Sequence, residues 1–164
     1  RIINRLLKNQ NDEFLWSWWE VSPHTSYWMS AHILRALKAA RGAGYAVNLD
    51  VKNLARKASY RYEFQKALHV RDADLLNALA TWGVPLDYAS LTRKVDSLIY
   101  KSQWIKNNWT GETKWKSSFL VQKLMVLEVK QLQQIPYERD SLLHYKREGI
   151  LGDIHFSDEV AASW

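Results

Sequence analysis

The chain has 164 residues, a formal net charge of +6, 47% hydrophobic residues and 24% charged residues. This length suits one domain with a substantial core, and the composition excludes an intrinsically disordered chain. Because the sequence contains no cysteine, it excludes a disulfide scaffold, cysteine-ligated zinc, thiol catalysis and a cysteine-derived thioester within this segment.

Helical periodicity of the apolar residues dominates the chain and predicts about seven helices. The first is expected over residues 2–9. The clearest helix is expected over residues 26–41, with Thr25 as its N-cap and with Gly42 and Gly44 as its stop signals. Its apolar residues form two stripes, so we expect this helix to bury two of its sides.

The next helices follow at short intervals. We expect one over residues 49–67 and one over residues 73–82, the second capped by Asp72 and closed by Gly83 and Pro85. The chain has only 6 glycines and 3 prolines, and so few helix-breaking residues favour long elements.

The C-terminal half continues the helical pattern. A helix is expected over residues 87–103, beginning with an aspartate cap, and a polar loop follows over residues 107–116. Two further helices are expected over residues 117–133 and 136–147, the last one beginning with a proline. No run shows sustained strand alternation, although residues 150–156 have the composition of a short extended segment.

A faint internal repeat supports stacked helix pairs. An aromatic-bearing loop followed by a cap and a helix recurs at residues 14–25, 109–117 and 156–158, and residues 68–72 form a similar turn without the aromatic residues. The spacing of about 40 to 50 residues is that of a helical hairpin in repeat proteins. The pattern therefore favours helical hairpins that close around an axis or stack as an open solenoid.

Tryptophan is the most unusual component, with 9 residues in the chain. An exposed tryptophan loop stacks on sugars, bases or the side chains of a partner, whereas a buried one seals the end of a helical body. We favour the seal for the whole Trp16-Ser-Trp-Trp19 cluster, and we expect Trp28, Trp82 and Trp104 in the core. The candidate partner-binding residues are Trp16, Trp18, Trp19, Trp109 and Trp115.

No assembled catalytic or metal site is evident in the sequence. The pairs His69/Asp72 and His155/Asp158 both read His-x-x-Asp, which occurs in metal half-sites but is more typical of helix caps. There is no His-Glu-x-x-His, no Gly-x-Ser-x-Gly and no phosphate-binding glycine loop. We therefore predict no catalytic residue, no cofactor and no metal.

Two charge patterns invite functional interpretation. Asp72-Ala-Asp74 is similar to the aspartate motifs of terpene cyclases, but no second acidic cluster accompanies it, so we interpret it as a helix start. The basic residues are dispersed, no nucleic-acid module accompanies them, and we interpret them as a solvated face. They form one helical row and one cluster, Lys52, Arg56, Lys57, Arg61, Lys66 and Arg71, and Lys101, Lys106, Lys114 and Lys116.

The arrangement resembles the alpha/alpha-toroid, or terpenoid-cyclase-like, region of bacterial alpha-2-macroglobulin-like proteins. The resemblance lies in Phe14-Leu-Trp-Ser-Trp-Trp19, in Ser26-Tyr27, in the Leu34, Leu37, Ala40 face and in Gly44-Tyr-Ala-Val47. It is strongest over residues 14–60. It implies an all-α fold, a full or partial toroid, and a place in a periplasmic or secreted envelope protein that traps proteases. The family's Cys-Gly-Glu-Gln thioester has no counterpart here.

We therefore expect residues 1–164 to form a single helical domain, a fragment of a larger toroid in a multidomain parent. Its expected function is a non-catalytic interaction or scaffold role, with other domains of the parent and proteases as partners, and without nucleic acid or direct membrane insertion. The alternative is an alpha/alpha-barrel enzyme acting on glycans, with a tryptophan platform and paired carboxylates. The carboxylates available for that chemistry are Asp72, Asp74, Glu112 and Asp158.

Overall fold

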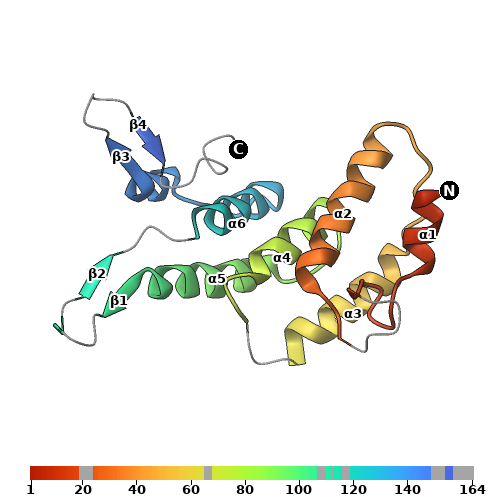
Figure 1. Cartoon of the computed structure of the whole chain (residues 1–164), viewed down its shortest axis with the longest axis horizontal. Helices are drawn as coiled ribbons and strands as arrows, with labels where there is room; N and C mark the ends of the chain where they lie inside the picture. Colours follow the sequence, from red (N-terminus) through yellow and green to blue (C-terminus); the bar gives the residue numbers. More distant parts are fainter. Residues whose placement is uncertain are drawn as a thin grey trace.

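The computed structural model describes residues 1–18, 24–64, 68–106, 110–111, 113–115, 119–148 and 154–156. Over these residues the body of the molecule is helical (Figure 1), which confirms the all-α prediction. The α-helices are α1 (Ile2–Lys8), α2 (Tyr27–Gly42), α3 (Val51–Phe64), α4 (Asp72–Thr81), α5 (Tyr88–Ser102) and α6 (Leu120–Leu132). Whether they belong to a closed toroid stays a prediction.

Short elements flank the helices. A 3-10 helix, η1, covers Arg139–Tyr145, and the strands are β1 (Trp104–Lys106), β2 (Thr113–Trp115), β3 (Lys146–Glu148) and β4 (Ile154–Phe156). β1 pairs with β2 and β3 pairs with β4, both antiparallel. The extended segment expected near residue 156 is therefore present as β4.

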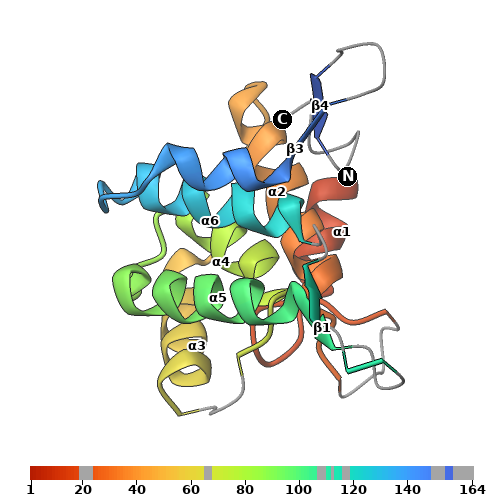
Figure 2. The same cartoon turned by 90° about the vertical axis from the view of Figure 1, so that its left-hand side faces the viewer.

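Helix α4 lies at the centre of the fold. Every residue from Asp72 to Ala80 is buried, because α4 packs against α2 on one side and against α5 and α6 on the other. Figure 2 shows α4, α5 and α6 running alongside one another. Because the buried residues include Asp72, Asp74 and Asn77, this burial follows from the helices that cover α4 on both sides, and α4 thereby joins the two halves of the described structure.

Two apolar clusters meet on opposite faces of α4. Leu75 and Leu79 pack with residues of α2 and α3, whereas Leu76 packs with residues of α5 and α6. Because residues four apart lie on one face of a helix and neighbouring residues point in different directions, this short leucine run serves both clusters.

Helix α2 buries mainly one of its two apolar stripes. Ala31, Leu34 and Leu37 are fully buried, as the first stripe predicts. In the second stripe, Ile33 is only partly buried and Ala36 is exposed.

The caps at the helix starts differ in part from the predicted ones. Ser26, and not Thr25, caps α2 by accepting a hydrogen bond from the backbone N–H of Met29. Thr25 instead accepts one from the Asn11 side chain at 2.8 Å. Asp87 caps α5 as predicted, accepting from the backbone N–H of Ser90 at 3.1 Å.

The predicted helix over residues 136–147 is wrong. The chain there forms the 3-10 helix η1 and then β3. Leu142 and Tyr145 both pack beside Leu120, and residues three apart align in a 3-10 helix, which explains the tighter winding. The predicted loop over residues 107–116 is also corrected, since β2 lies within it. Strands of three residues are too short to show alternation in a sequence.

Candidate functional site: an exposed aromatic cluster

The loop before α2 is built around Asn11. Its side-chain oxygen accepts hydrogen bonds from the backbone N–H groups of Glu13 at 3.0 Å and Leu15 at 3.2 Å. Its amide group reaches across to Thr25. Asparagine commonly organises turns in this way. The described part of the loop, residues 11–18, is therefore tied to the start of α2, and this places Trp16 and Trp18.

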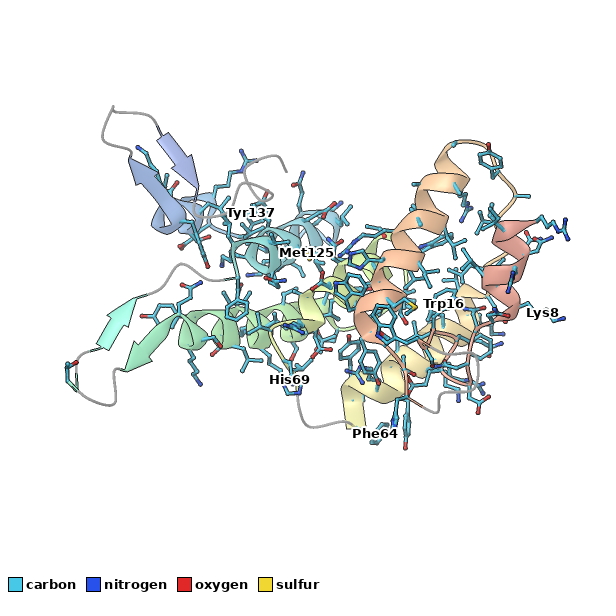
Figure 3. The ribbon with its side chains drawn as sticks, viewed as in Figure 1. Lys8, Trp16, Phe64, His69, Met125 and Tyr137 are labelled. Carbon is cyan, nitrogen blue, oxygen red and sulfur yellow. The ribbon has the colours of Figure 1, made fainter. Side chains whose placement is uncertain are left out.

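Trp16 seals the junction of α1 and α2. Its side chain is 3% exposed, its indole N–H donates to the Leu6 carbonyl at 2.8 Å, and its backbone N–H donates to the Ser30 hydroxyl at 2.9 Å. Figure 3 shows it between the two helices. The predicted seal is therefore present at Trp16, which is buried and unavailable to a partner.

Trp18 and Trp28 form a stack on the surface. Their ring centroids lie 5.8 Å apart with planes at 12°, and 64% of Trp18 and 52% of Trp28 are exposed. The expectation that Trp28 belongs to the core is wrong, and so is the expected seal at Trp18. The buried stripe of α2 contains Leu34 and Leu37, and Trp28 lies on the other side of the helix, one turn before the exposed His32.

His32 extends the stack to a third ring. Its centroid lies 4.1 Å from that of Trp28, and its Nδ1 lies 2.9 Å from the Trp28 carbonyl oxygen. Because a carbonyl only accepts hydrogen bonds, Nδ1 is the donor in this contact. We call Trp18, Trp28 and His32 the aromatic cluster. Sequence reasoning missed this cluster by expecting Trp28 in the core, and the i,i+4 spacing of Trp28 and His32 is the signal that could have found it.

Of the other tryptophans singled out in the sequence, one is confirmed in the core and the rest cannot be placed from the described side chains. Trp82 is in the core as predicted, 7% exposed, with its indole N–H donating to the Leu34 carbonyl at 2.8 Å. Trp19 and Trp109 lie outside the described residues. Trp115 is described only as part of β2, and Trp104 only as part of β1.

The carboxylates at the start of α4 have structural partners. Asp72 is 4% exposed; its carboxylate accepts from the Arg61 guanidinium at 3.2 Å and from the backbone N–H of His69 at 2.7 Å. Asp74 lies 3.8 Å from Arg35. The two carboxylates lie in the first turn of α4, as the interpretation of a helix start expects, but the predicted cap is wrong: the N-cap residue is Arg71, without a side-chain hydrogen bond, and not Asp72. The structure does not bring either carboxylate into the aromatic cluster.

Arg61 is turned inward, which corrects its placement on a solvated basic face. Its guanidinium lies 3.5 Å from the centroid of the Tyr27 ring as well as against Asp72. Burial raises the pKa of Tyr27, although the positive charge of Arg61 opposes that shift. Burial also raises the pKa of Tyr62, which is adjacent to Arg61 in α3.

A second polar network joins α2, α4 and α6. Arg35 donates to the Asp74 carbonyl at 3.0 Å, and Asn77 donates to the Glu128 carboxylate at 2.6 Å. Burial lowers the pKa of Arg35, and the charges of Asp74 and Glu128 oppose the shift. Each member has a partner, so this network fixes how the helices pack and offers no free catalytic group.

Neither a metal centre nor a membrane span is found among the described residues. They contain no group of three or more histidines, aspartates or glutamates placed to hold a metal ion, and no described helix has the length and apolar content to cross a membrane. Of the remaining candidates for glycan chemistry and for the His-x-x-Asp pairs, Glu112 and Asp158 lie outside the described residues, and His155 is described only as part of β4.

Comparison with protein-family models, with curated proteins and with solved structures found no match for this chain.

Proposed function

We propose that this chain is a non-catalytic interaction or scaffold domain, working in the context that its sequence resembles, an alpha-2-macroglobulin-like protein of the cell envelope. The observation that carries the proposal is the aromatic cluster, in which two tryptophans are more than half exposed. Exposed tryptophans held in a fixed orientation are the side chains that most often dominate binding energy at protein interfaces. In this proposal, Trp18 and Trp28 bind other domains of the parent protein and proteases.

The environments of Asp72 and Asp74 support a non-catalytic role for these two carboxylates. Asp72 and Asp74 are buried and face arginines, so neither is placed to donate a proton to a substrate or to attack one. A surface that binds and does not react needs only shape and apolar area, and the aromatic cluster supplies both.

The proposal is tested by protease binding. The protein is mixed with trypsin whose active-site serine is chemically blocked, so that digestion does not remove the complex, and the mixture is separated by size-exclusion chromatography. We expect a complex that the Trp18→Ala/Trp28→Ala double variant weakens by about a hundredfold or more, because each lost hot-spot indole costs about 2 kcal/mol and about 1.4 kcal/mol is a factor of ten.

Tyr45→Ala is the matched control, because Tyr45 is 64% exposed and follows the other end of α2. The control is expected to bind as the unmodified protein does. If blocked trypsin, blocked elastase and a blocked subtilisin all elute separately from the protein, the protease-trapping context fails. Equal weakening in both variants would show that the aromatic cluster is not the contact surface.

The same observation favours a second function, glycan binding, because tryptophan faces also stack on sugar rings. Titration with chitohexaose and cellohexaose, followed by the NMR signals of the indole N–H groups, distinguishes the two. Shifts confined to Trp18 and Trp28 at millimolar sugar would favour the glycan function. Hydrolysis of the sugar during the titration would establish the enzyme alternative.

A further inference from the structure

The outer face of α3 presents a row of four exposed side chains. Lys52, Arg56, Tyr60 and Phe64 follow one another at four-residue intervals and all are exposed. The rings of Tyr60 and Phe64 lie 5.1 Å apart, with 63% and 65% of the residues exposed. One half of the row is therefore basic and the other half aromatic, and Figure 3 shows Phe64 at the outer end of the helix.

A cavity opens beside the basic half of this row. It has a volume of about 520 Å³ and lies between α3 and the segment that follows α1. Leu7 and Phe14 give it apolar walls, Arg56 and Lys57 give it two positive charges, and Asp12 is the one carboxylate in its lining. A hydrogen bond connects two residues of this lining, since the side-chain amide of Gln10 donates to the Phe14 backbone carbonyl at 2.7 Å.

The two cations beside the cavity, Arg56 and Lys57, form no ion pair with any residue that the structure describes, including Asp12 in the same lining. Arg61, by contrast, belongs to the same helix and is held by Asp72. The positive charge next to the cavity is therefore available to a ligand, and a carboxylate is the group that complements it.

We propose that this face of α3, which we call the α3 face and define as Arg56, Lys57, Tyr60 and Phe64 with the adjoining cavity, binds an acidic peptide segment. Its carboxylates pair with Arg56 and Lys57, and a neighbouring apolar side chain enters the cavity against Phe14. A second apolar side chain rests on Tyr60 and Phe64. Arg56 and Phe64 are eight residues apart, about 12 Å along a helix, which about four residues of extended peptide span.

The geometry favours a peptide over a lipid surface or a nucleic acid. A bilayer surface is flat and does not follow a concave cavity, whereas a side chain does. A phosphate backbone needs positive charge along its whole path, and here Glu63 is exposed beside Phe64. The inference goes beyond the proposed function, because it uses none of the three residues of the aromatic cluster.

The test is fluorescence anisotropy with a labelled peptide, Gly-Leu-Glu-Asp-Gly-Gly-Phe-Gly, in about 50 mM salt, where exposed charges are weakly screened. The Arg56→Glu/Lys57→Glu variant is expected to weaken binding at least about tenfold, since attraction becomes repulsion. Arg93→Glu/Lys94→Glu on α5 is the matched control, with the same change in net charge, and is expected to bind within about twofold of the unmodified protein.

Two further measurements separate the parts of the site. Tyr60→Ala/Phe64→Ala is expected to weaken binding about fivefold, and a peptide with Gln and Asn in place of Glu and Asp is expected to lose binding as the charge reversal does. Trp18→Ala/Trp28→Ala is expected to keep the full peptide affinity, which separates this site from the aromatic cluster. Far-UV circular dichroism verifies that each variant is folded.

Several results would overturn the proposal. Equal losses in the α3 and α5 reversals would mean attraction by net charge alone. No binding of the peptide at any salt concentration would remove the site. Tighter binding of phosphatidylserine vesicles or single-stranded oligothymidylate than of the peptide, sensitive to Arg56→Glu/Lys57→Glu, would replace the peptide with that occupant.

Discussion

Replacing Asp72 with alanine is expected to lower the free energy of unfolding by about 3 kcal/mol. The Asp72 carboxylate joins three parts of the fold. It accepts a hydrogen bond from Arg61 of α3 at 3.2 Å, it accepts another from the backbone N–H of His69 at 2.7 Å, and it lies in the first turn of α4, where the helix dipole favours a negative charge.

The magnitude follows from these contacts. The charge-assisted bond to Arg61 is worth about 1.5 to 3 kcal/mol and the bond to His69 about 1 kcal/mol. The helix dipole adds about 0.5 kcal/mol. The loss lies near the lower limit of this sum, about 3 kcal/mol, because the Arg61 side chain is 14% exposed to solvent and keeps its contact with the Tyr27 ring in the variant.

The assay is urea unfolding followed by far-UV circular dichroism at pH 7. Asp140→Ala is the control, since Asp140 is exposed in η1 and its loss is expected to change stability by less than about 0.5 kcal/mol. In a double-mutant cycle with Arg61→Leu, we expect a coupling of about 1 kcal/mol or more. An Asp72→Ala variant as stable as the Asp140→Ala control would refute the reasoning.

Three other predictions concern the core and the surface. Leu79→Ala is expected to lower the free energy of unfolding, measured in urea, by about 3 kcal/mol because the Leu79 side chain is buried. Leu132 is 48% exposed, and Leu132→Ala is expected to lower it by less than about 0.5 kcal/mol. Equal losses in the two variants would contradict the central place of α4. Burial raises the pKa values of Tyr62 and Tyr88. Above about pH 10 the unfolded chain therefore loses these protons before the folded chain does, and the free energy of unfolding falls as pH rises. Tyr62→Phe is expected to make this fall less steep, and the same dependence on pH in the variant and the unmodified protein would contradict the prediction. Asp96→Asn breaks ion pairs with two lysines of α6 and is expected to lower the free energy of unfolding by about 1 kcal/mol at low salt and by less in 0.5 M NaCl. A loss of stability that does not depend on salt would show that the ion pairs are not its cause.

The sequence by itself determined the helical body of this protein. Apolar periodicity located the six α-helices of the described residues because a helix with a buried face carries its own pattern, and Asp87 marked the start of α5 because an N-cap acts within its own turn. Trp82 was correctly expected in the core. These are local properties, since each depends on residues within a few positions of one another.

Only the tertiary structure decided what the partners of each side chain are. Arg56 and Arg61 belong to one basic row in the sequence, yet one borders an open cavity and the other is held by Asp72 of α4. Trp16 and Trp18 are two residues apart, yet one is sealed and the other exposed. The same periodicity was expected to continue through η1, where packing on Leu120 selects the 3-10 form. Burial depends on which helices lie opposite, and that is a property of the whole chain and not of any one segment.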